Sequence, residues 1–170
     1  PFYFYNREKI KLYTNSETST FLLNRFDYLF KRNKNSQSYF EPPLELINID
    51  YYQNLIINDI SVHTIKQHHG VIDTLGFIIN NTFAYCTDVV SFPKESFECL
   101  YKLNTIIITG LRSTPHTAHA HFDLTFKWLA DLKPRVAYLT HLSPESDHDT
   151  VTKLCPSGVY PAYDGLVINI

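Results

Sequence analysis

The chain has 170 residues, a length that fits one domain with a sizeable hydrophobic core. Its hydrophobic content of 44% and charged content of 19% are ordinary for a globular protein, and its net charge of −2 argues against strong non-specific binding of nucleic acid. No apolar run is long enough to cross a bilayer and no signal peptide opens the sequence, so we expect neither a membrane span nor export.

The first part of the chain predicts a strand, a helix and a loop. Residues 9–13 suit a short strand, and Asn15 or Ser16 suits the cap of a helix that runs to about Phe30 with apolar residues on one face. The polar stretch 31–43 ends in two prolines, so we expect a loop there, of a length that suits a mobile flap. Three strands are expected next, at 44–49, 54–57 and 60–66.

The next segment predicts a β-hairpin. Residues 75–79 and 82–86 are mainly apolar, β-branched or aromatic, and Asn80 and Asn81 lie between them. Asparagine tolerates the left-handed backbone of a tight turn, so we expect these two runs to pair as antiparallel strands.

Polar side chains that could bind a metal flank this hairpin. His68 and His69 end the strand before it, and Asp88 follows it. Neighbours on a strand point to opposite faces, so at most one of the two histidines is expected to be a ligand. Asp88 follows a core-like strand and needs a partner such as a metal ion. The local alternative, an aspartate that only caps the next segment, stays open.

The remainder of the chain alternates between helix and strand. Two uncharged, β-branched runs suit strands that are buried on both faces. The alternation predicts an α/β fold, in which functional groups gather beyond the strand ends. In order, we expect a helix from Phe92 to about Leu103, a strand at 105–109, a loop at 110–121, a helix at 123–132, a strand at 136–140, a helix at 147–154 and a last strand at 166–170.

Three groups that could bind a metal occupy equivalent places. His69, Asp88 and His141 each follow a predicted strand, and all eight histidines of the chain lie at or after His63. Imidazole and carboxylate are ligands that Zn²⁺ and similar ions prefer. Single ligands spread over several strand ends are typical of catalytic sites, whereas structural zinc uses close local pairs.

A second candidate is the loop that carries His116, His119 and His121 within six residues. This loop could be a metal site in itself, a histidine-rich loop before a helix, or surface histidine. A histidine there could also act as a general acid or bind phosphate. The residues alone leave these alternatives open.

Six motifs together resemble the second half of a metallo-β-lactamase-fold hydrolase. The similar branch includes phosphoribosyl 1,2-cyclic phosphate phosphodiesterase and is related to the tRNA 3′-processing endonuclease. The resemblance runs from His63 to the C-terminus. It implies a partial αββα sandwich, with 1–170 forming one domain that is the C-terminal portion of the hydrolase. The motifs are Gln67-His68-His69-Gly70, Thr74-Leu75-Gly76-Phe77, Ala84-Tyr85-Cys86-Thr87-Asp88-Val89, Pro115-His116-Thr117-Ala118-His119-Ala120-His121, Leu139-Thr140-His141-Leu142-Ser143 and Ala162-Tyr163-Asp164-Gly165.

The resemblance also implies roles for individual residues. His69 would bind a first metal ion, Asp88 would bridge two ions and His141 would bind the second, with Zn²⁺ or Mn²⁺ as the metal. His119 would contact the scissile phosphate or protonate the leaving oxygen of a small phosphodiester. The residues expected near the substrate are Arg112, His116 and His121.

The chain departs from this family in one major respect. The motif His-x-His-x-Asp-His, which supplies most of the family's ligands, has no match in this sequence, and the stretch before Arg112 lacks the usual acidic start. The chain begins with Pro1 and contains no Met, so we expect that its true start has been lost or that it is a piece of something longer. The absence of the motif predicts an incomplete metal site. Three hypotheses follow: a split or truncated hydrolase that is inactive alone, a non-catalytic remnant, or a small α/β binding module.

The same features indicate partners and a compartment. An incomplete hydrolase would need an upstream half or a second copy of itself. The three cysteines have no Cys-x-x-Cys spacing, which is typical of free thiols in the reducing cytoplasm. They are Cys86, Cys99 and Cys155.

Overall fold

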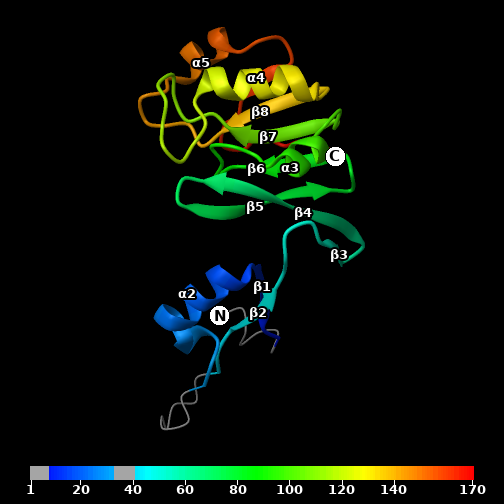
Figure 1. The fold of residues 1–170 in the computed structure, drawn as a ribbon, viewed down its shortest axis with the longest axis vertical. Helices are drawn as coiled ribbons and strands as arrows, with labels where there is room; N and C mark the ends of the chain where they lie inside the picture. The colour runs from blue at the N-terminus through cyan, green and yellow to red at the C-terminus, as the bar shows by residue number, and fades with distance from the viewer. Residues whose placement is uncertain (1–7, 33–40) are drawn as a thin grey trace. The chain divides into compact units, whose positions relative to one another are not determined.

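The computed structural model of the chain describes residues 8–32 and 41–170 (Figure 1). The chain forms two compact units, residues 1–51 and residues 52–170. The expectation of a single domain over 1–170 stays a prediction.

The first unit pairs two parallel strands, β1 (Ile10–Thr14) and β2 (Leu44–Asn48), and carries the helix α2 (Ser16–Phe26). The Asn15 side chain accepts a hydrogen bond from the Thr18 amide at 2.8 Å, so it is the predicted N-cap. The helix ends earlier than expected, at Phe26, and continues as a 3₁₀ turn, η1 (Asp27–Leu29). Most of the predicted flap, residues 33–40, lies outside the described residues.

The second unit is built on a seven-stranded sheet whose strands follow one another in chain order. The first four strands form an antiparallel meander, and the last four run parallel with helical crossovers. The strands are β3 (Asn54–Ile57), β4 (Ile60–His69), β5 (Ile72–Ile79), β6 (Phe83–Cys86), β7 (Thr105–Thr109), β8 (Val136–Thr140) and β9 (Val159–Pro161). The helices are α3 (Lys94–Cys99), α4 (Phe122–Leu132) and α5 (His148–Leu154).

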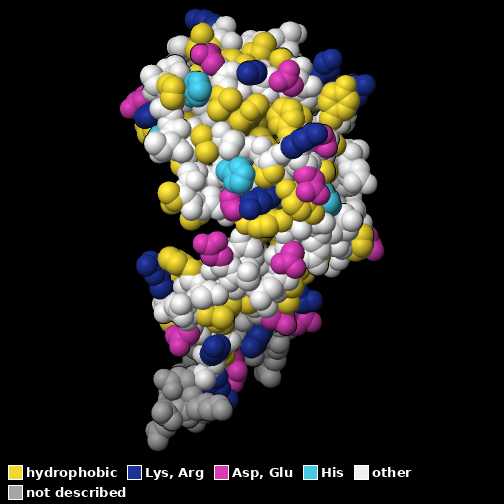
Figure 2. Space-filling model, in the orientation of Figure 1, with side chains coloured by type: hydrophobic (Ala, Val, Ile, Leu, Met, Phe, Trp, Pro, Cys, Tyr) yellow, Lys and Arg dark blue, Asp and Glu magenta, His cyan; other side chains and the backbone are white. Residues whose placement is uncertain are grey.

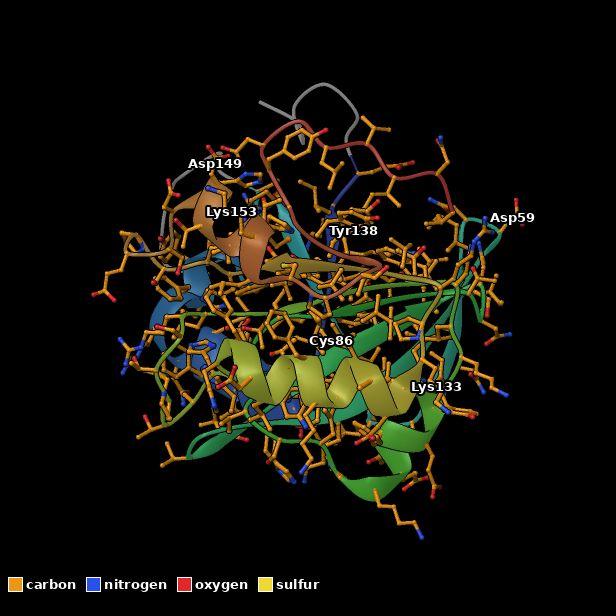
Figure 3. The ribbon with its side chains drawn as sticks, turned by 90° about the horizontal axis from the view of Figure 1, so that it is seen from above. Asp59, Cys86, Lys133, Tyr138, Asp149 and Lys153 are labelled. Atoms are coloured by element: carbon orange, nitrogen blue, oxygen red, sulfur yellow. The ribbon has the colours of Figure 1, made fainter. Side chains whose placement is uncertain are left out.

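The hydrophobic core lies between one face of this sheet and the helices α3 and α4. Alternate residues of the central strands point to that face and are fully buried, including Cys86, Ile106 and Leu139. They pack against Leu100, which follows α3, and Leu129 on α4. Figure 3 shows α4 on the side of the sheet where Cys86 lies and Tyr138 on the opposite side, toward α5.

The predicted hairpin turn is confirmed between β5 and β6. Asn80 and Asn81 have φ of 50° and 55°, the left-handed conformation that the turn requires. The Thr82 amide donates to the Ile79 carbonyl at 3.1 Å, and the Asn80 side chain accepts from the Ser61 amide at 3.1 Å. The turn therefore fixes the register of three neighbouring strands.

Several boundaries differ from the sequence-based expectation. β4 extends to His69 and β5 begins at Ile72, because the cross-strand ladder continues to the tight turn that joins them. α3 ends at Cys99 rather than near Leu103, since the chain turns back there and the Lys102 amide bonds to Leu132. The predicted last strand at 166–170 is wrong: among the described residues this segment pairs with no strand, and the short β9 takes the place beside β8 instead.

The surface of the described residues is mixed in charge. Figure 2 shows acidic and basic side chains interspersed on the face in view.

Within 8–32 and 41–170, no helix combines the length and the apolar character needed to cross a membrane.

Candidate metal centre

Four polar side chains meet at one edge of the sheet. His69 is the last residue of β4, Asp88 follows β6, His141 follows β8, and His119 comes from the loop between β7 and α4. β6, β7 and β8 are parallel, so their carboxyl ends share an edge. β4 is antiparallel to β5, which is antiparallel to β6, and β4 therefore ends at the same edge. We call these four residues the strand-end cluster.

The cluster is centred on one carboxylate oxygen and one imidazole. Asp88 Oδ1 lies 3.9 Å from His69 Nε2 and 3.7 Å from His141 Nδ1. His119 lies against both other histidines: its Nε2 is 3.2 Å from His69 Nε2, and its ring centroid is 4.4 Å from that of His141. The structure thus brings together the three residues predicted as metal ligands and the one predicted to contact phosphate.

Backbone geometry places the histidine loop against the end of β4. Gly70 has φ of 66°, and a Cβ on it would lie 3.3 Å from the Cβ of Ala118, so the turn and the loop approach closely. The Ala120 amide donates to the Val89 carbonyl at 2.8 Å, which joins the loop to the segment after Asp88. His141 itself has φ of 62°, an uncommon conformation for a residue with a side chain, and such outliers are frequent at functional sites.

His68 points away from the cluster, as strand alternation predicts. Its Nδ1 lies 2.6 Å from Asp73 Oδ1, and Lys66 Nζ lies 2.7 Å from the other oxygen of the same carboxylate. The hydrogen bond from Lys66, and to a lesser degree the one from His68, lowers the pKa of Asp73 despite partial desolvation. Of the two neighbouring histidines, only His69 faces the candidate centre.

The three predicted substrate-binding residues differ in their contacts with the strand-end cluster. The His116 ring is 5.2 Å from that of His119, and its Nδ1 accepts from the Ala118 amide. Arg112 donates to two carbonyls of its own loop, those of Thr114 and Pro115, both at 3.4 Å. His121 precedes α4 without a capping bond, and no described hydrogen bond or ring contact joins it to the cluster. Their roles toward a substrate stay predictions.

Burial and neighbouring imidazoles act on the pKa of His119. Partial burial lowers the pKa of His119, and the nearby imidazoles of His141 and His69 lower it further, while Asp88 acts in the opposite direction. His119 is therefore more readily neutral than an exposed histidine.

The donor set of the cluster fits a divalent metal ion. Ligand atoms of His69, Asp88 and His119 lie within 4.8 Å of one another. Two ligand atoms on one tetrahedral zinc, each about 2.0 Å from it, lie roughly 3.3 Å apart, which is close to the separations seen here. The buried Nδ1 atoms of His69 and His119 have no hydrogen-bond partner among the described residues. The Nε2 atoms of His69 and His119 and the Oδ1 atom of Asp88 lie close enough together to suit a cation between them.

Three further residues, to which the sequence-based prediction gave no role, touch Asp88 or its neighbours. Thr74 Oγ1 donates to the Asp88 carbonyl at 2.6 Å, and Thr87 Oγ1 donates to Asp88 Oδ2 at 3.1 Å. Gln67, only 1% exposed, donates to Thr74 at 3.1 Å. Adjacency to Asp88 is a local signal for Thr87, whereas the contact of Thr74 depends on pairing across the hairpin.

A cavity adjoins the cluster at His141. Its volume is about 410 Å³, within the range of small-molecule sites. It offers a polar wall beside the candidate metal ligands. The lining residues are Thr140, His141, Leu142, Ala162, Tyr163 and Asp164.

A mixed sheet with α3 and α4 on one face and α5 on the other, and with histidine and aspartate side chains at the ends of its strands, matches the metallo-β-lactamase class of folds that the sequence predicted. The chain belongs to the beta-lactamase superfamily domain family, which matches residues 4–142.

Three solved structures illustrate this likeness. A diphosphatase from the PhnP family is 26% identical, with a TM-score of 0.81 over 94% of this chain and 57% of that one. Zn²⁺-bound PqqB from Methylobacterium extorquens is 13% identical, with a TM-score of 0.69 over 97% of this chain and 66% of that one. Unliganded yeast PDE1 is 16% identical, with a TM-score of 0.65 over 94% of this chain and 60% of that one.

The last two likenesses support the fold alone. The chain spans between 57% and 66% of the length of these three proteins. No curated protein matches the chain.

Proposed function

We propose that the strand-end cluster is part of a divalent-metal centre that hydrolyses a small phosphodiester. The observation that carries this proposal is the position of Asp88 Oδ1, which lies 3.9 Å from His69 Nε2 and 3.7 Å from His141 Nδ1. One oxygen between two imidazoles suits a carboxylate shared by two ions. The 26% identity to a PhnP-family diphosphatase supports hydrolysis at a phosphate group.

Each member of the cluster then has a task. His69 and Asp88 would hold one ion, and Asp88 and His141 the other, with Zn²⁺ or Mn²⁺ as the metal. A divalent ion bound there supplies Lewis-acid chemistry, which activates water and offsets negative charge on the phosphate. His119 would donate an N–H hydrogen bond to the phosphate or a proton to the leaving oxygen as the phosphorus–oxygen bond breaks. Arg112, His116 and His121 would bind the outer part of the substrate.

The proposal includes dependence on a further segment. A catalytic zinc keeps three protein ligands and an open position. The cluster offers each ion one terminal ligand and a shared carboxylate, so affinity for metal falls short of that shell. We expect the missing ligands from an upstream half that carries the motif His-x-His-x-Asp-His, because a second copy of the chain lacks this motif as well. The free thiols of the three cysteines favour the cytoplasm as the compartment.

The test is hydrolysis of cyclic and linear phosphodiesters with added Zn²⁺ or Mn²⁺. The chain by itself is expected to show little or no turnover, and the chain mixed with a fragment that carries the missing motif is expected to gain metal-dependent turnover. Asp88→Ala should abolish that gain because it removes the shared ligand. His68→Ala is the matched control and should retain it, because His68 faces Asp73 instead.

Two results would contradict the proposal. Robust turnover by the lone chain, abolished by Asp88→Ala, would show that no further segment is needed. Failure of the mixture to bind metal would favour the alternative, a non-catalytic remnant or a small α/β binding module.

A further inference from the structure

Two threonine hydroxyls hold Asp88 in the chain without a ligand, one at its backbone carbonyl and one at its carboxylate. Its backbone carbonyl accepts from Thr74 and its carboxylate accepts from Thr87. We propose that Thr74, anchored by the buried Gln67, and Thr87 are positioning residues that fix Asp88 Oδ1 toward His69 and His141. The part of this inference that concerns metal affinity depends on the proposed function. The part that concerns the order of Asp88 does not.

The two hydrogen bonds that join Gln67 to Thr74 and Thr74 to Asp88 form a relay with a defined donor-to-acceptor direction. The Thr74 hydroxyl has one hydrogen, and its 2.6 Å contact with a carbonyl requires that this hydrogen point to Asp88. Thr74 must then accept at its oxygen, which it does from Gln67 Nε2 at 3.1 Å. Gln67 is almost fully buried, so its end of this chain of bonds is shielded from water.

Thr87 restricts the carboxylate itself. Its hydroxyl donates to Oδ2 at 3.1 Å, which leaves Oδ1 as the oxygen that faces the two imidazoles. Rotation of the carboxyl group would break this bond. One oxygen is therefore held by the protein and the other is free to be shared.

The surroundings of Gln67 indicate that its position in the relay carries an unfavourable free-energy term. Gln67 Oε1 is buried and has no hydrogen-bond partner among the described residues, an unfavourable arrangement that an apolar residue would avoid. Gly76 makes room for this amide: a Cβ there would lie 2.7 Å from Gln67 Oε1 and 2.9 Å from Ile65 Cγ1. The hydrogen bond from Gln67 Nε2 to Thr74 Oγ1 offsets the cost of the unpaired oxygen.

The consequence is preorganisation of the shared ligand. A carboxylate that is ordered in advance loses little conformational freedom when it binds a cation. Groups that orient metal ligands typically contribute 10- to 100-fold in affinity. We therefore expect the Thr74 hydroxyl to affect both the order of Asp88 in the metal-free chain and its affinity for metal.

The experiment compares three variants of the full chain. Thr74→Val keeps the branched shape and removes the hydroxyl, and Thr74→Ser restores a hydroxyl. Thr109→Val is the matched control, because Thr109 is a buried threonine at the end of β7 whose hydroxyl has no partner among the described residues. The first measurement is the amide order parameter of Asp88 by ¹⁵N relaxation without metal. The second is Zn²⁺ affinity by calorimetry.

We expect Thr74→Val to lower the order parameter of Asp88 from a rigid value of about 0.85 toward about 0.6. Zn²⁺ affinity should fall about 10-fold or more. Thr74→Ser should recover both quantities, and Thr109→Val should change neither.

An unchanged order parameter in a folded Thr74→Val chain would overturn the inference, as would an equal loss in Thr109→Val. If the starting chain binds no Zn²⁺ while Asp88 loosens as expected, the inference on Asp88 stands and the proposed metal centre fails.

Discussion

At the scale of single residues, the end of β4 separates two neighbouring histidines. His69 lies 3.2 Å from His119, whereas His68 bonds to Asp73 on the other face of the sheet. Strand geometry alone produces this division, since successive side chains point to opposite faces. The two positions therefore form a natural pair of test and control.

We expect His69→Ala to lower the affinity of the chain for Zn²⁺ by more than about 10-fold, because it removes one of the few ligands of an ion. His68→Ala should leave that affinity within about 2-fold, because the His68 side chain bonds to Asp73 and is not one of the groups that orient a ligand, whose loss typically costs about 10-fold or more. Isothermal titration of both variants measures the difference. Equal losses in the two variants would contradict the assignment of His69.

A second prediction concerns Asp73 and pH. Its partners Lys66 and His68 lower its pKa below the ordinary value of 3.8, so the ionised form stabilises the fold. This stabilisation is present above the pKa of the unfolded chain and is lost as pH falls through the lowered folded value. Asp73→Asn should reduce the free energy of unfolding at pH 7, and the difference from the starting chain should shrink below about pH 4. Urea unfolding at several pH values measures it. A difference that stays constant to pH 2 would contradict the prediction.

At the scale of elements, the β5–β6 hairpin depends on its two asparagines. Asn80 and Asn81 both adopt left-handed backbone conformations, and Asn80 also bonds to Ser61 at the start of β4. The turn thus sets the register that carries His69 and Asp88 to one edge. A shift by one residue would send every side chain of a strand to the other face.

We expect Asn81→Val to destabilise the chain by about 1–2 kcal/mol, because a β-branched residue is strained in the left-handed region. Asn81→Gly should leave stability unchanged or higher, since glycine suits this position best. Chemical denaturation measures both. A valine variant as stable as the glycine variant would show that the turn adopts another conformation in solution.

At the scale of the whole molecule, the two faces of the seven-stranded sheet differ. Helices α3 and α4 cover one face, and the opposite face carries a row of large side chains in cross-strand register. Tyr85 and Tyr160 in this row are 43% and 51% exposed. Helix α5 lies toward the Tyr138 end of this row, and the large side chains that stay exposed beyond it are typical of an association surface. The row consists of Phe77, Tyr85, Ile107, Tyr138 and Tyr160.

We expect this row to bind the proposed upstream half or a second copy of the chain. Tyr85→Ser should weaken that association about 10-fold, because a tyrosine anchor contributes more than about 1 kcal/mol to an interface. Tyr101→Ser is the control, since Tyr101 is 50% exposed but lies outside the sheet. Sedimentation of the chain, alone and with the upstream fragment, measures the change. An equal effect of the two substitutions would exclude the row as the interface.

Local sequence determined much of the second unit. The strands Asn54–Ile57, Thr105–Thr109 and Val136–Thr140 have the predicted limits, because turn residues bound short runs rich in β-branched and apolar side chains. The Asn-Asn turn and the alternation of His68 and His69 also follow from local rules. So does the placement of Asp88 and His141 directly after strands.

Only the tertiary structure decided which of these groups meet. The direction of β4, reversed twice by the meander, brings His69 to the same edge as Asp88 and His141. Packing of the histidine loop against Gly70 places His119, rather than His121, beside them. The segment Val159–Pro161, and not residues 166–170, forms the strand beside β8. A strand needs a partner to hydrogen-bond with as well as a suitable sequence pattern. Strand order and register join residues far apart in the chain, and no local pattern encodes these long-range pairings.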